Sequence, residues 1–141
     1  MLFEGVPRLR RAGLDLPGLC AGDAARVAVE AYPGMLARRL IGRRSYKSDD
    51  RGRATAARAA ARQDILDLVR AGALRTEYGL TVEAPDWLAQ APDGDGLDAL
   101  LGAVQAAWAW QSVLPQGAGP AGIDALEGWI ADPQCVRRRG V

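Results

Sequence analysis

One segment restricts the possible folds of this chain more than any other, and it runs from Asp93 to Gln111 (DGDGLDALLGAVQAAWAWQ). Between Asp98 and Gln111 the only polar side chain is that of Gln105. Such a composition predicts a helix, beginning at Asp95 and ending near Ser112, that is apolar on nearly every face. A helix of this kind is expected to be buried on nearly every side, including its Trp108 and Trp110 rings. The rest of the chain would then pack around it.

Two carboxylates, Asp95 and Asp98, stand three residues apart where this helix is expected to begin. Free backbone N–H groups and the positive end of the helix dipole stabilise carboxylates at such a position. The pair can therefore act as a cap, with Asp95 as the N-cap residue and Asp98 in the first turn. The same side chains can also hold a metal ion, and the pattern leaves both interpretations open.

The sequence contains no histidine. This excludes Ser-His-Asp triads, Cys-His dyads and histidine-ligated zinc within the chain. The two cysteines, Cys20 and Cys135, are far apart and form neither a disulfide framework nor a zinc motif. Any metal site would be built from oxygen ligands, which favours Mg²⁺ or Mn²⁺.

The length of 141 residues fits a single domain, 1–141, with one hydrophobic core. No apolar run approaches the roughly 20 residues that span a bilayer, and the N-terminus lacks the order of a signal peptide. We therefore expect a cytoplasmic protein with no membrane partner. Residues 134–141 are expected to form a loose tail.

Charge is unevenly distributed along the chain. Between residues 38 and 62 there are nine cations, whereas residues 77–132 contain nine acids and no Lys or Arg. A basic segment beside an acidic one suggests a binding surface for an anion near an acidic site. The candidates for phosphate contact are Arg43, Arg44 and Lys47. The alternative is a solvated helix face without a binding role.

The periodicity predicts an α/β chain that is rich in helix and has few strands. Residues 1–13 read as a helix that stops at Gly13, and residues 25–34 (ARVAVEAYPG) as a buried strand with Glu30 at its carboxyl end. A helix is expected over residues 35–41, and a short edge strand over residues 126–133.

A longer helix is expected over residues 54–74, where alanine is abundant. Its apolar face would carry Ala57, Ala61, Ile65, Leu68 and Val69, and Arg58 and Arg62 would lie away from that face. Residues 73–94 read as turns, a possible short strand and a loop rich in Pro and Gly.

The carboxyl ends of strands in open α/β sheets are where ligands bind, which adds Glu30 to the two helix carboxylates. Three acids that converge without a counter-ion repel one another, and a divalent cation removes that conflict. Two such cations can clamp the attacking and leaving oxygens during cleavage of a phosphodiester. The sequence thus predicts Glu30, Asp95 and Asp98 as metal ligands and catalytic residues.

Several motifs in this order resemble a family of uncharacterised proteins known as domain of unknown function 429, over roughly residues 27–133. They are VAVEAYPG, SYKSD, DGLDALLGAVQAAWA and LEGWIADP. The family is regarded as a predicted nuclease group with a ribonuclease-H-like fold. The resemblance implies that Glu30 corresponds to the fourth-strand acid and Asp98 to the last-helix acid. It also implies that Asp95 resembles the paired last-helix acids of Holliday-junction resolvases, and that the ligands bind two Mg²⁺ ions.

The resemblance covers only the C-terminal portion of the ribonuclease-H-like fold. The strand that carries the first Asp of such nucleases has no counterpart before residue 27. We therefore expect a metal-dependent nuclease or phosphodiesterase that is incomplete or inactive as this chain. Two alternatives remain: a non-catalytic module that binds nucleic acid or protein, and a subunit whose missing strands come from a second copy or a partner chain.

Overall fold

The computed structural model describes residues 2–48, 55–116, 119–120, 123–124 and 128–137. The chain divides into two compact units. The first unit combines residues 1–31 with residues 106–141, and the second unit comprises residues 32–105. The division falls within one helix, between Gln105 and Ala106. The prediction of a single domain is not tested by this division and stays a prediction.

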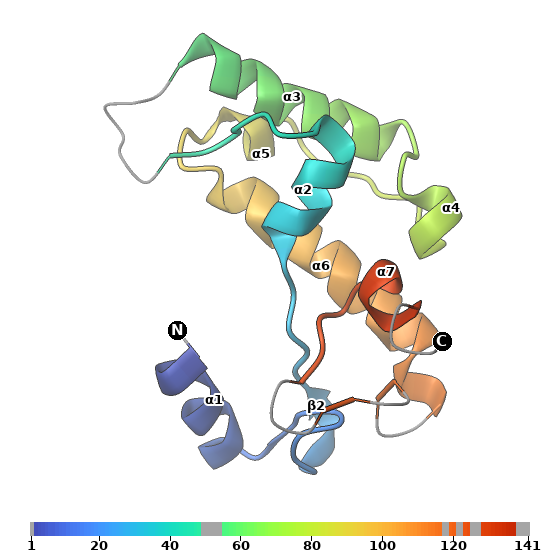
Figure 1. Cartoon of the computed structure of the whole chain (residues 1–141). Coiled ribbons are helices and arrows are strands. Elements are labelled where there is room, and N and C mark those ends of the chain that lie inside the picture. The colour runs from blue at the N-terminus through green and yellow to red at the C-terminus, as the bar shows by residue number, and fades with distance from the viewer. Residues whose placement is uncertain (1, 49–54, 117–118, 121–122, 125–127, 138–141) are drawn as a thin grey trace. The chain divides into compact units, whose positions relative to one another are not determined.

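The second unit consists of helices and loops in its described part. It contains α2 (Pro33–Ile41), α3 (Ala56–Arg70), α4 (Arg75–Tyr78), α5 (Trp87–Gln90) and the beginning of α6 (Asp95–Ser112). Helix α3 packs against both α2 and α5 (Figure 1). The core of this unit is mainly aliphatic, with fully buried side chains such as Leu36, Ile65 and Leu97, and it also contains Tyr78.

Helix α3 confirms the helix predicted over residues 54–74, with a correction to its faces. Thr55 caps its start, because the side chain accepts a hydrogen bond from Arg58 N at 3.2 Å. Ala61, Ile65 and Val69 are buried as predicted. In contrast, Ala57 and Leu68 are exposed.

The prediction that Arg62 lies away from the buried face is wrong, because only 4% of this residue is exposed. Its guanidinium donates hydrogen bonds to the backbone carbonyls of Tyr46 and Ala89 in the same unit. A buried arginine is tolerated when its donors are satisfied in this way.

The loop interpretation of residues 73–94 is also wrong in part. Residues 75–78 and 87–90 form the short helices α4 and α5, whose buried residues include Tyr78 and Leu88. Gly79 ends α4 in the left-handed conformation that favours glycine. Two one-turn helices leave little periodicity to read, which explains why the sequence did not indicate them.

The first unit contains α1 (Leu2–Arg11), β1 (Leu14–Asp15), β2 (Asp23–Val27), the end of α6, the 3₁₀ turn Leu114–Gln116 and α7 (Pro133–Arg137). Strands β1 and β2 are parallel, with an irregular register between Leu14 and Asp15. Among the described residues this is a two-stranded sheet. The chain is thus mixed α/β and mainly helical, as predicted at that coarse level.

The buried strand predicted over residues 25–34 is wrong. Strand β2 ends at Val27, and four of its five residues are exposed. Glu30 lies three residues beyond it, in an isolated parallel bridge with Ile130, where Ala131 N donates to Glu30 O at 2.8 Å. Pro33 then begins α2, since proline suits the first turn of a helix.

The C-terminal predictions are corrected where the structure describes them. Within the predicted strand 126–133, Gly128 and Ile130 take part only in isolated bridges. Residues 133–137 form α7, with Asp132 before it accepting a hydrogen bond from Gln134 N at 3.0 Å. Residues 134–137 are therefore helical, and the rest of the predicted loose tail, residues 138–141, lies outside the described residues.

Helix α6 confirms the predicted bounds but is less buried than expected. Trp108 is buried, whereas 63% of Trp110 is exposed.

None of the helices in the described part of the chain is both long and apolar enough to cross a membrane.

Candidate functional site at the beginning of helix α6

The carboxylate of Asp98, in the first turn of α6, is held by two neighbouring side chains. The Tyr46 hydroxyl donates to Asp98 Oδ1 at 2.5 Å, and Lys47 Nζ forms an ion pair with Asp98 Oδ2. We call Tyr46, Lys47 and Asp98 the Asp98 cluster. All three belong to the second unit, and two of them come from the loop that follows α2. The cluster thus joins the SYK segment of the sequence to the head of the apolar helix.

The buried side chain of Arg62 holds the loop that carries Tyr46. Arg62 Nη1 donates to Tyr46 O at 3.0 Å, and Arg62 Nε donates to Ala89 O at 2.8 Å. One buried side chain from α3 therefore ties the loop to α5. Because both acceptors are backbone carbonyls, the guanidinium satisfies groups that water would otherwise have to reach.

Gly94 lets the loop approach the beginning of α6 closely. Its φ is +77°, in the left-handed region, and a Cβ there would lie 2.8 Å from Lys47 Cβ. It would also lie 3.4 Å from the Tyr46 ring. Only glycine satisfies both the backbone conformation and the lack of space.

Gln105 provides a second polar anchor on α6. Its Oε1 accepts a hydrogen bond from Tyr32 N at 2.8 Å, and none of the residue is exposed. Seven residues separate it from Asp98, which places the two on one face of the helix, two turns apart. The polar side chain that interrupts the apolar run therefore holds the backbone just before α2.

The hydroxyl of Tyr46 titrates above its ordinary range. Burial raises the pKa of Tyr46 most, followed by its hydrogen bond to the Asp98 carboxylate, the negative charge of Asp98 and a smaller contribution from Tyr32. Each effect disfavours the phenolate. Tyr46 is thus a neutral hydrogen-bond donor at physiological pH.

This shift predicts how stability depends on pH. The unfolded chain releases the Tyr46 proton near pH 10, roughly the ordinary value, whereas the folded chain retains it. The stabilisation is therefore complete below about pH 10 and is lost as the pH rises toward the folded-state pKa, by about 1.4 kcal/mol per pH unit. In urea titrations, the parent should lose unfolding free energy more steeply than Tyr46→Phe over this range. Parallel curves would contradict the prediction.

The structure places the three predicted metal ligands as follows. Asp95 is the first residue of α6 and its N–H donates to Asp93 Oδ1 at 3.1 Å, so the prediction of Asp95 as N-cap is wrong by one residue. Asp98 lies three residues along the same helix. Glu30 is exposed and belongs to the first unit. The described residues contain no group of three acidic or sulfur side chains placed to hold a metal, and the convergence of these three stays a prediction.

Asp98 has a counter-ion, because Lys47 forms an ion pair with it. Two of the three predicted phosphate contacts, Arg44 and Lys47, form ion pairs with acids of the chain. Arg44 Nη1 pairs with Asp64 Oδ2 at 2.5 Å, and Arg43 is exposed. Among the described cations of the basic segment, Arg39, Arg44 and Lys47 thus neutralise acids of their own unit.

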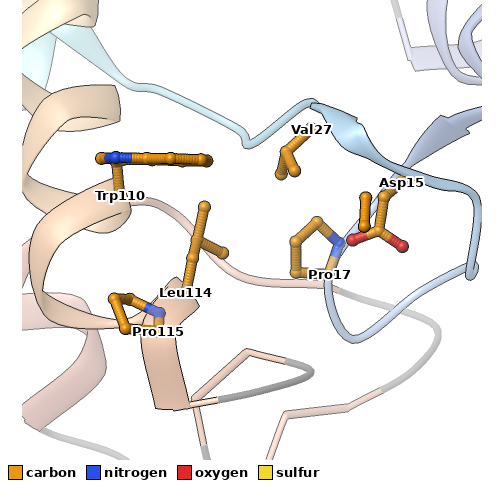
Figure 2. A pocket seen from close by; sticks show the side chains of 7 residues that line it. Asp15, Pro17, Val27, Trp110, Leu114 and Pro115 are labelled. Atoms are coloured by element: carbon orange, nitrogen blue, oxygen red, sulfur yellow. The ribbon is translucent and has the colours of Figure 1, made fainter.

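A cavity of about 560 Å³ lies in the first unit (Figure 2). Figure 2 shows Trp110 and Leu114 on one side of it and Asp15 on the other, with Val27 and Pro17 also in the wall. Asp15 Oδ1 already accepts a hydrogen bond from Gly22 N at 3.0 Å. A single carboxylate among apolar side chains offers no second group for acid–base or nucleophilic chemistry. The Asp98 cluster is therefore the better candidate site.

Comparisons with family models, curated proteins and solved structures found no match to this chain.

Proposed function

We propose that the chain carries the last-helix part of a metal-dependent phosphodiesterase or nuclease site of the ribonuclease-H-like kind. The observation that carries the proposal is the Asp98 cluster, where a lysine ammonium sits on a carboxylate in the first turn of an apolar helix. The cation of this pair lies where a divalent ion would neutralise Asp98. The resemblance of the motifs around Tyr32, Lys47 and Asp98 supports the same proposal.

The donor set fits a divalent ion that prefers oxygen. Asp95 and Asp98 stand on neighbouring turns of one helix face, and the Asp98 side chain is 23% exposed, so an ion can reach it. Mg²⁺ keeps several waters and is commonly bound by one or two carboxylates together with substrate phosphates. Asp95 and Asp98 would hold it, and the bound ion would supply Lewis-acid stabilisation of charge on phosphate oxygens.

The other residues of the cluster bind and orient. Lys47 neutralises Asp98, and its side chain is 42% exposed, so it can contact a phosphate group as a point charge. Tyr46 fixes the orientation of the Asp98 carboxylate and remains protonated because its pKa is raised. Arg62 and Gly94 set the position of the loop that carries both.

Calorimetric titration with Mn²⁺ tests the site. Asp98→Asn should abolish the binding heat seen with the parent, because it removes the charged ligand. Lys47→Met should instead raise Mn²⁺ affinity, by up to about fivefold, because the competing ammonium is worth roughly 1 kcal/mol in a partly exposed pair.

Asp86→Asn is the matched control. It removes an exposed carboxylate of the same unit that pairs with Arg70 at 2.7 Å and takes no part in the Asp98 cluster. This variant should bind Mn²⁺ as the parent does. A parent that binds no Mn²⁺, or an Asp98→Asn variant that binds it equally well, would refute the metal-site assignment.

A second candidate function is non-catalytic binding of nucleic acid. It is favoured by the full engagement of Asp98, since both carboxylate oxygens already have partners within the protein. In that case the acids are structural and Lys47 and Arg43 contact phosphates. Salt-dependent binding of an oligonucleotide that persists in a chelator, with no cleavage under Mg²⁺ or Mn²⁺, would favour this candidate over the first.

A further inference from the structure

Tyr32 is an exposed aromatic residue whose backbone is held firmly. Its N–H is bound by the buried Gln105 side chain, and Pro33 begins α2 directly after it. Yet 55% of Tyr32 is exposed. A Cβ on Gly34 would lie 3.4 Å from Tyr32 Cε2, so the ring lies back along the first turn of α2. The ring is thus presented to solvent from a fixed position.

We propose that Tyr32 stacks on an unpaired nucleobase of a strand whose phosphate contacts Lys47, which makes single-stranded nucleic acid the ligand of this surface. The proposal rests on the proposed function for its choice of a nucleic acid as ligand. It adds the class of nucleic acid and the residue that recognises it.

The spacing of the two anchors on α6 supports this assignment. Gln105 holds Tyr32 and Asp98 holds Lys47, and the seven residues between them correspond to about 10 Å along the helix axis. A stacked strand advances about 3.4 Å per nucleotide, so about three nucleotides cover the axial distance between the two anchors. An exposed ring and a cation whose segments are both anchored on this helix are the two kinds of contact that single-strand binding surfaces use.

The Tyr46 ring, whose centroid lies 5.9 Å from Lys47 Nζ, is not available for stacking. Tyr46 is buried, and its hydroxyl is occupied by Asp98. Tyr32 also contributes electrostatically to the raised pKa of Tyr46, which places the two phenols within range of each other. Bases inside a duplex already stack on their neighbours, so the exposed Tyr32 ring selects strands with unpaired bases.

Fluorescence anisotropy in a chelator tests the inference without cleavage. The probes are a fluorescein-labelled oligothymidylate and a deoxyribose-phosphate strand of equal length that lacks bases. The parent should bind oligothymidylate more tightly by about 5- to 100-fold, because stacking on one aromatic ring is worth roughly 1–3 kcal/mol. Tyr32→Ala should lower this affinity to that for the abasic strand, and Tyr32→Phe should retain it.

The controls separate stacking from general loss of aromatic surface. Trp87→Ala removes a ring of α5 that is 61% exposed and should change affinity by less than about twofold. The inference is overturned if Tyr32→Ala binds oligothymidylate as the parent does, if Trp87→Ala weakens binding as much, or if the parent binds no oligothymidylate. A Tyr32 effect that persists while Mn²⁺ binding is absent would support the inference and refute the metal site.

Discussion

Replacing Arg62 with methionine is expected to lower the free energy of unfolding by about 3 kcal/mol, although methionine matches much of its apolar stem. The substitution removes the donors to Tyr46 O and Ala89 O, and both acceptors lie beside a residue that is 4% exposed. An unsatisfied buried carbonyl costs roughly 1–3 kcal/mol. Urea denaturation followed by tryptophan fluorescence measures the difference.

Two further variants serve as controls for the Arg62→Met measurement. Gln63→Met changes the adjacent exposed residue, whose amide donates to Asp67 Oδ1 at 2.9 Å, and should cost less than about 0.5 kcal/mol. Arg62→Lys keeps the charge but lacks the planar fork that reaches two carbonyls, so it should recover only part of the loss. If Arg62→Met were as stable as Gln63→Met, the hydrogen bonds from Arg62 to the loop and to α5 would contribute nothing to the free energy of unfolding.

The helices that the sequence predicted well are those with local signals. Helix α6 has a long apolar run with carboxylates at its start, and α3 has many alanines after a threonine cap. Helix α2 matches its prediction to within two residues at its start. In each of these helices the signal lies within the helix or directly before it, which is the range that a pattern can report.

The strand predicted over residues 25–34 failed because its signal was brief. Two valines, Val27 and Val29, suggested β structure, but a strand also needs a partner, and partners come from elsewhere in the chain. In the structure β2 pairs with β1, only two residues long, and Glu30 pairs separately with Ile130. No periodicity in residues 25–34 carries that information.

The sequence indicated two residues of the candidate site, Asp98 and Lys47, but not the interaction between them. The sequence predicts separate roles for Asp98 as a metal ligand and Lys47 as a phosphate contact. The structure joins them in one ion pair across 51 positions of sequence. Gln105 did offer a signal, because a single amide in an apolar helix must find a hydrogen-bond partner when buried. Arg62 offered none, since its partners are backbone carbonyls that any sequence possesses.

Replacing Gly94 with alanine is expected to be similarly severe, with a loss of about 3–4 kcal/mol in the free energy of unfolding. Roughly 1–2 kcal/mol comes from the positive φ of +77°. The rest comes from a methyl group placed 2.8 Å from Lys47 Cβ, an atom too close to the backbone to move freely. Relief requires the loop to shift, which would pull Lys47 and Tyr46 away from Asp98.

Gly13→Ala isolates the cost of the backbone conformation alone. Gly13 has a φ of +73°, and a Cβ there would meet nothing within 4 Å, so its loss should stay near 1–2 kcal/mol. The excess loss in Gly94→Ala then measures the close approach of the loop to α6. Gly94→Ala should also make the loss of stability at alkaline pH less steep, because the Tyr46 hydroxyl no longer reaches the Asp98 carboxylate. A Gly94→Ala protein with the stability and the pH profile of Gly13→Ala would show that the Asp98 cluster does not depend on this approach.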